Sequence, residues 1–412
     1  MINRLELFRS QIAAFDGAAD PMSAISKGYF IEEPQQSSTN ALFKRISLRP
    51  QSKILLIGGI GSGKTTQFLR LQQLFQQAPG TGIYPHYIDV TEYTMPNDIQ
   101  VGTLDAIVAL ELMKILEQTG FSIDINQEMS IKEFAYGYTI DDHSHLVDEL
   151  IKKQSMSDLF LRSNISSPKQ ILRKVSGVLK SSPRSNNSLN QLSQIIDSLV
   201  ENFKTQFNQV PYFLFDGLDR VDETDKFTRM AASDLQISKI GFTIIGATSL
   251  LYGSFISGID SIFNHVEYRS AFDVDRDENA RTFFERVLIA RSSQDFFQQD
   301  ALQNLISCSG GVLRDLINLT QESIQEAYLA DSDIIDLEHV EKAVFSLGRA
   351  KMLGLNGEQS ATLRNLTNLT NQIPTVPTSP EEIYLLSGGR ILEYRFPERR
   401  FDVHPVLKQL LA

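Results

Sequence analysis

The sequence predicts an α/β fold, in which a parallel sheet carries helices on both faces and an all-helical region follows it. Before residue 273, short apolar runs rich in β-branched and aromatic residues alternate with stretches of helical periodicity. The first of these runs enters a glycine-rich turn that opens a helix. From residue 274 to residue 350 the periodicity is helical only, which predicts a separate helical layer.

The apolar runs predict strands at residues 53–57, 84–90, 212–215, 242–247 and 265–268. Helical spacing of apolar residues predicts helices at residues 65–75, 104–116, 189–207, 280–289, 299–307, 312–330 and 337–347. Because the strands alternate with helices, we expect them to lie parallel in one sheet.

The same pattern divides the chain into four parts. Residues 1–50 have mixed character and are interpreted as an N-terminal lead-in segment. Residues 51–273 form the α/β domain, with a polar, serine-rich helical insertion at about residues 120–187. Residues 274–350 form a helical lid, and residues 351–412 form a small winged-helix-like unit.

The expectation for the last unit depends on one predicted hairpin. Residues 383–386 and 391–394 are apolar runs on either side of Ser387, Gly388 and Gly389, a turn-forming sequence. We interpret the two runs as paired strands, with helices before and after them.

Composition excludes several classes of protein. The 412 residues are 42% hydrophobic and 22% charged, as in an ordinary globular protein. The net charge of −11 opposes sequence-independent attraction to nucleic acid, which depends on positive charge. One cysteine, Cys308, excludes an internal disulfide framework, and no run of apolar residues is long enough to span a membrane. We expect a cytoplasmic protein.

The glycine-rich turn matches the phosphate-binding pattern G-x-x-x-x-G-K-[ST]. A predicted strand precedes it and a predicted helix follows it, which is the context that this motif requires and that a chance glycine-rich turn lacks. The motif predicts binding of ATP with Mg²⁺ in a P-loop NTPase fold. The expected nucleotide-binding residues are Gly58, Gly59, Ile60, Gly61, Ser62, Gly63, Lys64, Thr65 and Thr66.

Each part of the motif has a chemical reason. Glycines let backbone N–H groups turn inward around a phosphate, and the helix N-terminus adds positive dipole. Lys64 is expected to reach the β- and γ-phosphates, and the Thr65 hydroxyl is expected to bind Mg²⁺.

Two aspartates complete the predicted chemistry. Asp216 ends the apolar strand at residues 212–215 and is the expected second Mg²⁺ ligand; the alternative is an aspartate that caps the following turn. Asp219 is a candidate to orient or deprotonate the attacking water. A solvated turn carboxylate, or a salt bridge to Arg220, remains open as its other interpretation.

With these motifs, the chain resembles AAA+ and STAND ATPases, especially origin-recognition-like and KAP-like members. The resemblance covers about residues 45–350 without the insertion, and Asp216 to Arg220 resembles the D-x-x-D-R end of their second motif. It implies a polar sensor residue at Thr248 or Ser249, for which a helix cap is the alternative. It also implies a prokaryotic source.

Arg314 is the strongest residue to carry over from that family. The sequence Ser309 to Asp315 resembles the G-G-x-x-R sensor region of their helical lid. A cation in the first turn of a helix opposes the helix dipole, which suggests an anionic partner elsewhere. The γ-phosphate of ATP is one candidate, and a neighbouring acidic side chain is the other.

Two departures limit the resemblance. No arginine lies between Thr248 and the strand at residues 265–268, where many relatives place an arginine finger; Arg269, just beyond that strand, is a weak substitute. The missing arginine puts hydrolysis that depends on a neighbouring subunit in doubt. The other departure is the insertion, which separates the second and third strands.

Other features have two interpretations each. Tyr29 and Phe30 are candidates to stack on adenine or to pack in the core. Two basic groups are candidates for nucleic-acid contact. For the group in the insertion a solvated helix face is the expectation, because no aromatic residues interleave its cations. For the group in the tail the resemblance leaves contact with DNA and packing against protein both open. The two groups are Lys169, Arg173, Lys174, Lys180 and Arg184 in the insertion, and Arg395, Arg399 and Arg400 in the tail.

The functional expectation is Mg²⁺-dependent ATP hydrolysis that drives a conformational or assembly switch. The partner is expected to be another copy of the chain or a protein effector, and nucleic acid is not favoured. An ATP-dependent DNA-binding initiator or loader is the alternative from another class. A scaffold that binds ATP without turnover is the third.

Overall fold

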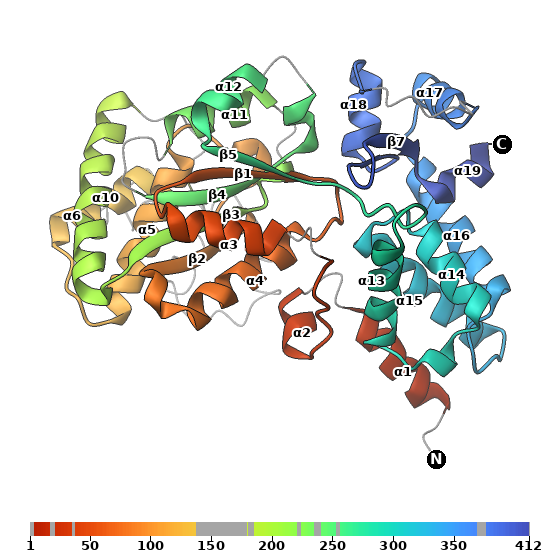
Figure 1. Ribbon diagram of the computed structural model, residues 1–412. Coiled ribbons are helices and arrows are strands. Elements are labelled where there is room, and N and C mark those ends of the chain that lie inside the picture. The colour runs from red at the N-terminus through yellow and green to blue at the C-terminus, as the bar shows by residue number, and fades with distance from the viewer. Residues whose placement is uncertain are drawn as a thin grey trace, which may run out of the picture.

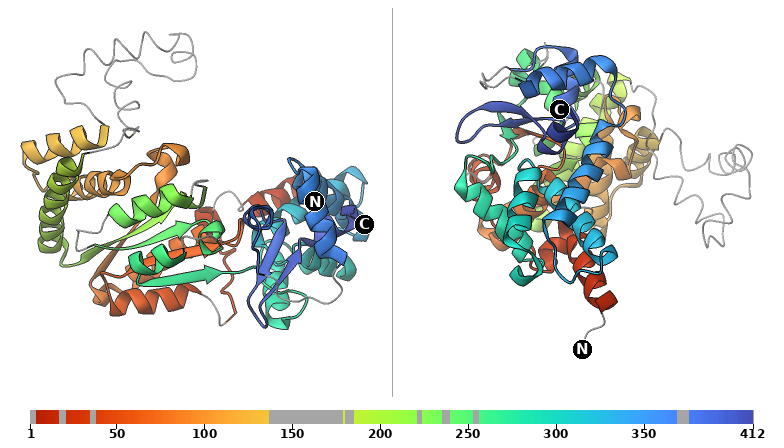
Figure 2. Two further views of the ribbon diagram at one scale, coloured as in Figure 1. Left: turned by 90° about the horizontal axis from the view of Figure 1, so that it is seen from above. Right: turned by 90° about the vertical axis from the view of Figure 1, so that its right-hand side faces the viewer.

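The computed structural model describes residues 4–16, 21–34, 38–136, 179, 185–220, 224–234, 240–252, 256–368 and 376–411. Two parts lie side by side: one contains the sheet, and the other consists mainly of helices (Figures 1 and 2). Most of the insertion, including the five basic residues considered for nucleic-acid contact, lies outside the described residues. No helix in the described ranges is long and apolar enough to cross a membrane.

The sheet of the first part has five parallel strands in the order β2-β3-β4-β1-β5. They are β1 (Lys53–Gly58), β2 (Ile83–Asp89), β3 (Val210–Asp216), β4 (Gly241–Gly246) and β5 (His265–Arg269). The five strands that the sequence predicts for this sheet are all present within a few residues of their expected bounds. The predicted α/β fold with a parallel sheet is therefore confirmed.

Helices cover both faces of this sheet (Figure 1). Along β1, Ile54 and Leu56 pack with α3 (Ser38–Leu48) and α4 (Lys64–Gln77) on one face. Leu55 and Ile57 belong to the core on the other face. Because successive strand residues point to opposite faces, a strand buried on both sides is apolar at every position.

The second face is covered by α5 (Thr103–Gln118) and α10 (Asn186–Phe207), with α6 (Ile125–Tyr136) packed beside them. Two shorter helices, α11 (Thr224–Ser233) and α12 (Ile256–Ile262), contribute Phe227 and Ile259 to the same core and lie beside β5 in Figure 1. Helix α6 is the described part of the predicted insertion.

The second part is built from α13 (Glu278–Ile289), α14 (Gln299–Cys308), α15 (Leu313–Leu329) and α16 (Leu337–Met352). Helix α1 (Arg4–Phe15) also packs here, with Phe8 buried and its ring 5.6 Å from that of Phe296. The short helix α2 (Pro21–Ser26) lies between the two parts, and α3 returns to the sheet (Figure 1). The N-terminal residues thus contribute to both cores.

The C-terminal unit comprises α17 (Gly357–Asn368), α18 (Pro380–Ser387), β6 (Ile391–Tyr394), β7 (Arg400–Val403) and α19 (Pro405–Leu411). The predicted strand at residues 383–386 is wrong, because these residues form part of α18. Ser379 caps that helix with Glu382 in a reciprocal capping box, and Pro380 occupies its first turn. The hairpin forms instead between β6 and β7, which pair antiparallel.

Candidate functional site

The glycine-rich turn connects β1 to α4, as predicted, and needs its glycines for two reasons. Gly61 and Gly63 have φ of 80° and 86°, a left-handed conformation that other residues rarely adopt. A Cβ atom on Gly61 would also lie 2.7 Å from Cβ of Arg314. Helix α4 begins at Lys64, so its N-terminal N–H groups and positive dipole end face the turn.

Lys64 is buried, and its ammonium group contacts its own turn and one carboxylate. It donates to the carbonyl oxygens of Gly58 and Gly59, at 2.9 and 3.0 Å. It also forms an ion pair with Asp219, at 3.1 Å between Nζ and Oδ2. The sequence did not predict Lys64 as the partner of Asp219. The expected alternative, a salt bridge from Asp219 to Arg220, is not tested, because the side chain of Arg220 lies outside the described residues.

Thr65 and Asp216 meet although they are 151 positions apart in the sequence. The Thr65 hydroxyl donates to Oδ2 of Asp216 at 2.6 Å. The Tyr87 hydroxyl donates to the same oxygen at 3.0 Å, and the N–H of Gly217 donates to Oδ1 at 2.7 Å. The hydroxyl and carboxylate that the sequence proposed as metal ligands are therefore adjacent.

Sequence reasoning missed Tyr87. It lies on β2, whose pairing with β3 places Asp89 beside Asp216. Burial, and then the Asp216 carboxylate, raise the pKa of Tyr87 well above its usual value. Its hydroxyl therefore stays protonated and acts as a donor to Asp216. Only the strand register, which the sequence does not reveal, brings the two together.

The residues fit a magnesium ion held partly by a nucleotide. In the described ranges, no three His, Cys, Asp or Glu side chains form a group able to hold a metal. Mg²⁺ in phosphate-transferring sites commonly takes one or two protein oxygens and completes its coordination with phosphate oxygens and water. Asp216 and Thr65 supply such a pair. Nearby Asp89 uses Oδ1 to accept from the N–H and hydroxyl of Thr91.

Arg314 is the second residue of α15, which begins at Leu313 after the N-cap Val312. Its backbone N–H donates to the carbonyl oxygen of Gly61 at 3.3 Å, which joins the helical part to the phosphate loop. Its side chain is exposed and makes no ion pair with any described residue. The neighbouring-acid interpretation therefore gains no support from the described contacts.

Arg269 ends β5 and is buried. Its guanidinium group pairs with the carboxylate of Glu33, at 2.9 Å between Nη1 and Oε2, and Nε donates to the carbonyl oxygen of Ser62. Gln67 also donates to Glu33, at 3.4 Å. Arg269 thus connects the N-terminal segment to the phosphate loop of its own chain. Sequence reasoning found no role for Glu33.

Thr248 is buried at the start of the short 3₁₀ helix η7 (Thr248–Leu251), after β4. Neither Thr248 nor Ser249 is among the residues that line the cavity described next. The structure therefore brings Lys64, Thr65, Asp216, Asp219 and Arg314 to one cavity but not Thr248.

The cavity lies between the two parts and has a volume of about 1400 Å³. Its polar end is lined by the phosphate loop and the residues around Asp216. Its other end is lined by mostly apolar side chains of the N-terminal segment and the helical part. These include Tyr29, Phe30, Ile31, Val287 and Ile317.

Tyr29 and Phe30 therefore line the cavity, and Tyr29 also packs against the core of the helical part. The guanidinium of Arg291 lies 5.4 Å from the ring centre of Tyr29, and that of Arg70 lies 5.4 Å from that of Phe30. Burial lowers the pKa of Arg291 to about 10, which leaves it charged at neutral pH. These two aromatic side chains offer the cavity a surface on which a nucleobase could stack.

Comparison with known proteins yields only distant likenesses. No family model matches the sequence, and no curated protein matches it. The ORC2 protein of Aeropyrum pernix, solved in ADPNP–ADP complexes, is 13% identical, with 92% of this chain and 94% of that chain covered and a TM-score of 0.43. The Holliday junction branch migration motor RuvB of Thermotoga maritima is 16% identical, with 91% and 94% covered and a TM-score of 0.38.

A third solved structure, Drosophila ORC bound to DNA, is 11% identical, with 99% of this chain and 91% of that chain covered and a TM-score of 0.42. Likenesses of this size assign neither an activity nor a partner to the present chain.

Proposed function

We propose that this chain binds ATP with Mg²⁺ and hydrolyses it, and that the nucleotide controls how the helical part sits on the α/β part. The observation that carries the proposal is the contact between Thr65 and Asp216, 2.6 Å apart beside a phosphate loop of the expected sequence. A nucleoside triphosphate requires a phosphate loop, a metal-binding pair and an apolar, aromatic surface for its base, and this cavity contains all three.

The chain's own residues divide the work of hydrolysis. Lys64 leaves the carbonyl oxygens of Gly58 and Gly59 and its pair with Asp219 to contact the β- and γ-phosphates. Asp219, released from Lys64, accepts a hydrogen bond from the attacking water and orients it in line with the γ-phosphate. Mg²⁺, held by Thr65 and Asp216, would supply charge to offset that of the phosphate oxygens.

Arg314 connects the reaction to a change of conformation. Its side chain lies at the cavity without an acidic partner in the described residues, and its backbone is bonded to Gly61. The γ-phosphate is a partner present in ATP and absent from ADP. Arg314 therefore favours a closed arrangement with ATP and a looser one with ADP.

The partner in this proposal is a protein: a second copy of the chain or a separate effector. The tail arginines are each engaged with a carboxylate of their own chain, which limits what they offer to DNA. Arg395 and Arg399 pair with Glu393 at 2.8 and 3.0 Å, and Arg400 pairs with Asp273 at 2.7 Å. A binding face for a phosphate backbone needs cations that are free to contact it.

Phosphate release by purified protein, with and without Mg²⁺, tests the proposal. Turnover that requires Mg²⁺ and disappears in Lys64→Ala supports an ATPase. Tight ATP binding without phosphate release would favour the scaffold instead. Stimulation of turnover by DNA, with a steep dependence on salt, would favour the initiator or loader.

A further inference from the structure

The turn that presents Arg314 to the cavity is covered on its other side by the C-terminal unit. Gly310 and Gly311 have φ of 60° and 73°. A Cβ atom on Gly310 would lie 2.6 Å from Leu392 and 2.9 Å from Pro405. On Gly311 it would lie 1.6 Å from the carbonyl oxygen of Phe272. Both positions require glycine because the C-terminal unit and the chain that leaves β5 pack against them. These contacts explain the glycines without a ligand.

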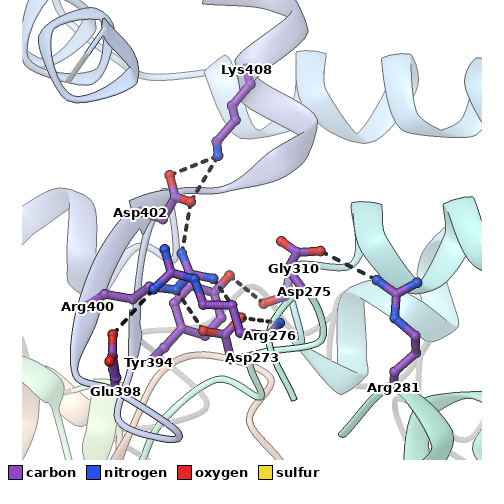
Figure 3. Close-up of polar contacts among 10 residues, drawn as sticks. All are labelled: Asp273, Asp275, Arg276, Arg281, Gly310, Tyr394, Glu398, Arg400, Asp402 and Lys408. Carbon is purple, nitrogen blue, oxygen red and sulfur yellow. Dashed lines mark hydrogen bonds and ion pairs between the residues drawn. The ribbon is translucent and has the colours of Figure 1, made fainter. Parts of the chain in front are cut away.

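The hairpin of the C-terminal unit is bonded to that turn. Tyr394, on β6, donates its hydroxyl to the carbonyl oxygen of Gly310 at 3.0 Å (Figure 3). Its ring lies 4.0 Å from the guanidinium of Arg400, which binds both oxygens of Asp273 at 2.7 Å. All of these side chains are buried. The hairpin therefore holds the turn and the segment that follows β5 together.

A second connection lies immediately after Arg314. Asp315 accepts from Nε2 of His404 at 3.0 Å and pairs with Lys351 at 2.9 Å. His404 uses its other ring nitrogen, Nδ1, to accept from the N–H of Val406 at 3.4 Å. This pattern places the ring proton on Nε2, where it is donated to Asp315. The C-terminal unit thus contacts the turn before Arg314, at Gly310, and after it, at Asp315.

We propose that Tyr394 and His404 are positioning residues for Arg314. Tyr394 acts through Gly310, and His404 acts through Asp315. The proposal rests on the proposed function, in which Arg314 contacts the γ-phosphate. The two hydrogen bonds make the turn and the C-terminal hairpin one unit. When ATP draws Arg314 toward the phosphate loop, the hairpin moves with it, so the C-terminal unit reports the state of the nucleotide.

Two measurements on Tyr394→Phe test this role, because the change removes one hydroxyl and keeps the ring. Amide hydrogen exchange over residues 309–316, without added nucleotide, should become faster in this variant. The affinity for a non-hydrolysable ATP analogue should also fall, whereas the affinity for ADP should not. We expect the preference for the ATP analogue to fall about fivefold, the size of one buried hydrogen bond, with ADP affinity unchanged.

Tyr212→Phe is the matched control. It removes an equally buried hydroxyl, bonded to Thr243 at 2.9 Å, from the middle of the sheet. It should leave both the exchange of residues 309–316 and the nucleotide preference as in the wild type. His404→Gln keeps a donor at the position of Nε2 and should retain the preference, whereas His404→Ala should lose it.

Unchanged exchange over residues 309–316 in Tyr394→Phe, or equal losses of ATP and ADP affinity, would overturn the positioning role. Arg314→Ala separates this failure from that of the proposed function. If the Arg314→Ala variant retains the wild-type preference for ATP over ADP, the sensor role of Arg314 is wrong. If Arg314→Ala loses the preference and Tyr394→Phe keeps it, only the positioning role is wrong.

Discussion

The ammonium group of Lys64 lies 3.1 Å from the carboxylate of Asp219, and both side chains line the same cavity. This carboxylate competes with phosphate for the lysine. ATP binding must therefore exchange one anionic partner of Lys64 for another. In the proposed function this exchange frees the Asp219 carboxylate to accept a hydrogen bond from the attacking water.

Asp219→Asn should bind ATP more tightly and hydrolyse it more slowly. The change removes a negative charge that repels phosphate and holds Lys64, so affinity should rise severalfold, by about 1 kcal/mol. Turnover should fall about 100-fold or more if the carboxylate orients the water. Asp275→Asn is the control for the loss of one negative charge. It removes a carboxylate whose Oδ1 lies 3.9 Å from Nη2 of Arg281. Turnover at the wild-type rate would assign water activation to another residue.

Asp216→Asn should retain nucleotide but lose the Mg²⁺ dependence of its binding and turnover. A neutral amide is a weak ligand for Mg²⁺, and the Thr65 hydroxyl would lose its acceptor Oδ2. Asp89→Asn is the matched variant, because Asp89 is the neighbour of Asp216 in the sheet but bonds to Thr91. Titration with Mg²⁺ at fixed ATP should separate the two. Equal effects of both substitutions would place the metal between the strands.

Glu33→Gln should destabilise the fold. The Glu33 and Arg269 side chains are 10% and 6% exposed, and removal of one partner from a buried pair commonly costs about 3 to 5 kcal/mol. The same change frees the carbonyl oxygen of Ser62 to shift, so ATP affinity should also fall. Arg276→Ala, which loses an exposed pair of 3.6 Å with Glu398, should change stability by less than about 1 kcal/mol. Urea unfolding measures both. Equal stability of the two variants would contradict a structural role for Glu33.

Acid should weaken the fold through His404. Burial lowers the pKa of this histidine below its usual value of 6.5, and the positive charge of Lys351 lowers it further. The hydrogen bond to Asp315, which also pairs with Lys351, acts in the opposite direction but does not reverse the shift. Below about pH 6.5 the unfolded chain takes up a proton at this position more readily than the folded chain. The free energy of unfolding should therefore decrease as pH falls from about 7.5 toward 5.5.

His404→Gln tests this dependence, since glutamine donates to Asp315 but does not titrate. The variant should lose less stability than the wild type over the same pH range. The Asp315 carboxylate, whose pKa is held below its usual value by His404 and Lys351 despite its burial, contributes a second loss at more acidic pH. Identical pH profiles of wild type and variant above about pH 5.5 would assign the acid sensitivity to other groups.

Local sequence patterns predicted much of the fold. Strand β1 is apolar on both faces, and the glycine-rich turn after it has only one common structural context, so both were readable from a few neighbouring residues. The start of α15 beside Arg314 was also predicted correctly. The strand expected at residues 383–386 was wrong because its apolar residues suit a helix equally well. The capping pair Ser379 and Glu382, which decides for the helix, was overlooked.

The contacts that organise the site were harder to predict. Glu33 and Arg269 are 236 positions apart, and Tyr87 and Asp216 are 129 apart. Neither pair has a local signature, because the strand order and the path of the N-terminal segment bring them together. The role of Gly310 is a similar case. It belongs to the sensor-like sequence Ser309 to Asp315, from which only the role of Arg314 was inferred, and its closest contacts are with the C-terminal unit.

The most direct test of the account is the binding and turnover of ATP by wild-type protein and Lys64→Ala. The account predicts Mg²⁺-dependent phosphate release by the wild type. It predicts that Lys64→Ala loses both ATP affinity and turnover while its thermal unfolding without nucleotide changes little. Among the residues that the structure describes, the polar contacts of the lysine ammonium are with loop carbonyls and Asp219, so its loss should not disturb the core. Wild-type ATP affinity in Lys64→Ala would contradict a phosphate-binding role for this loop.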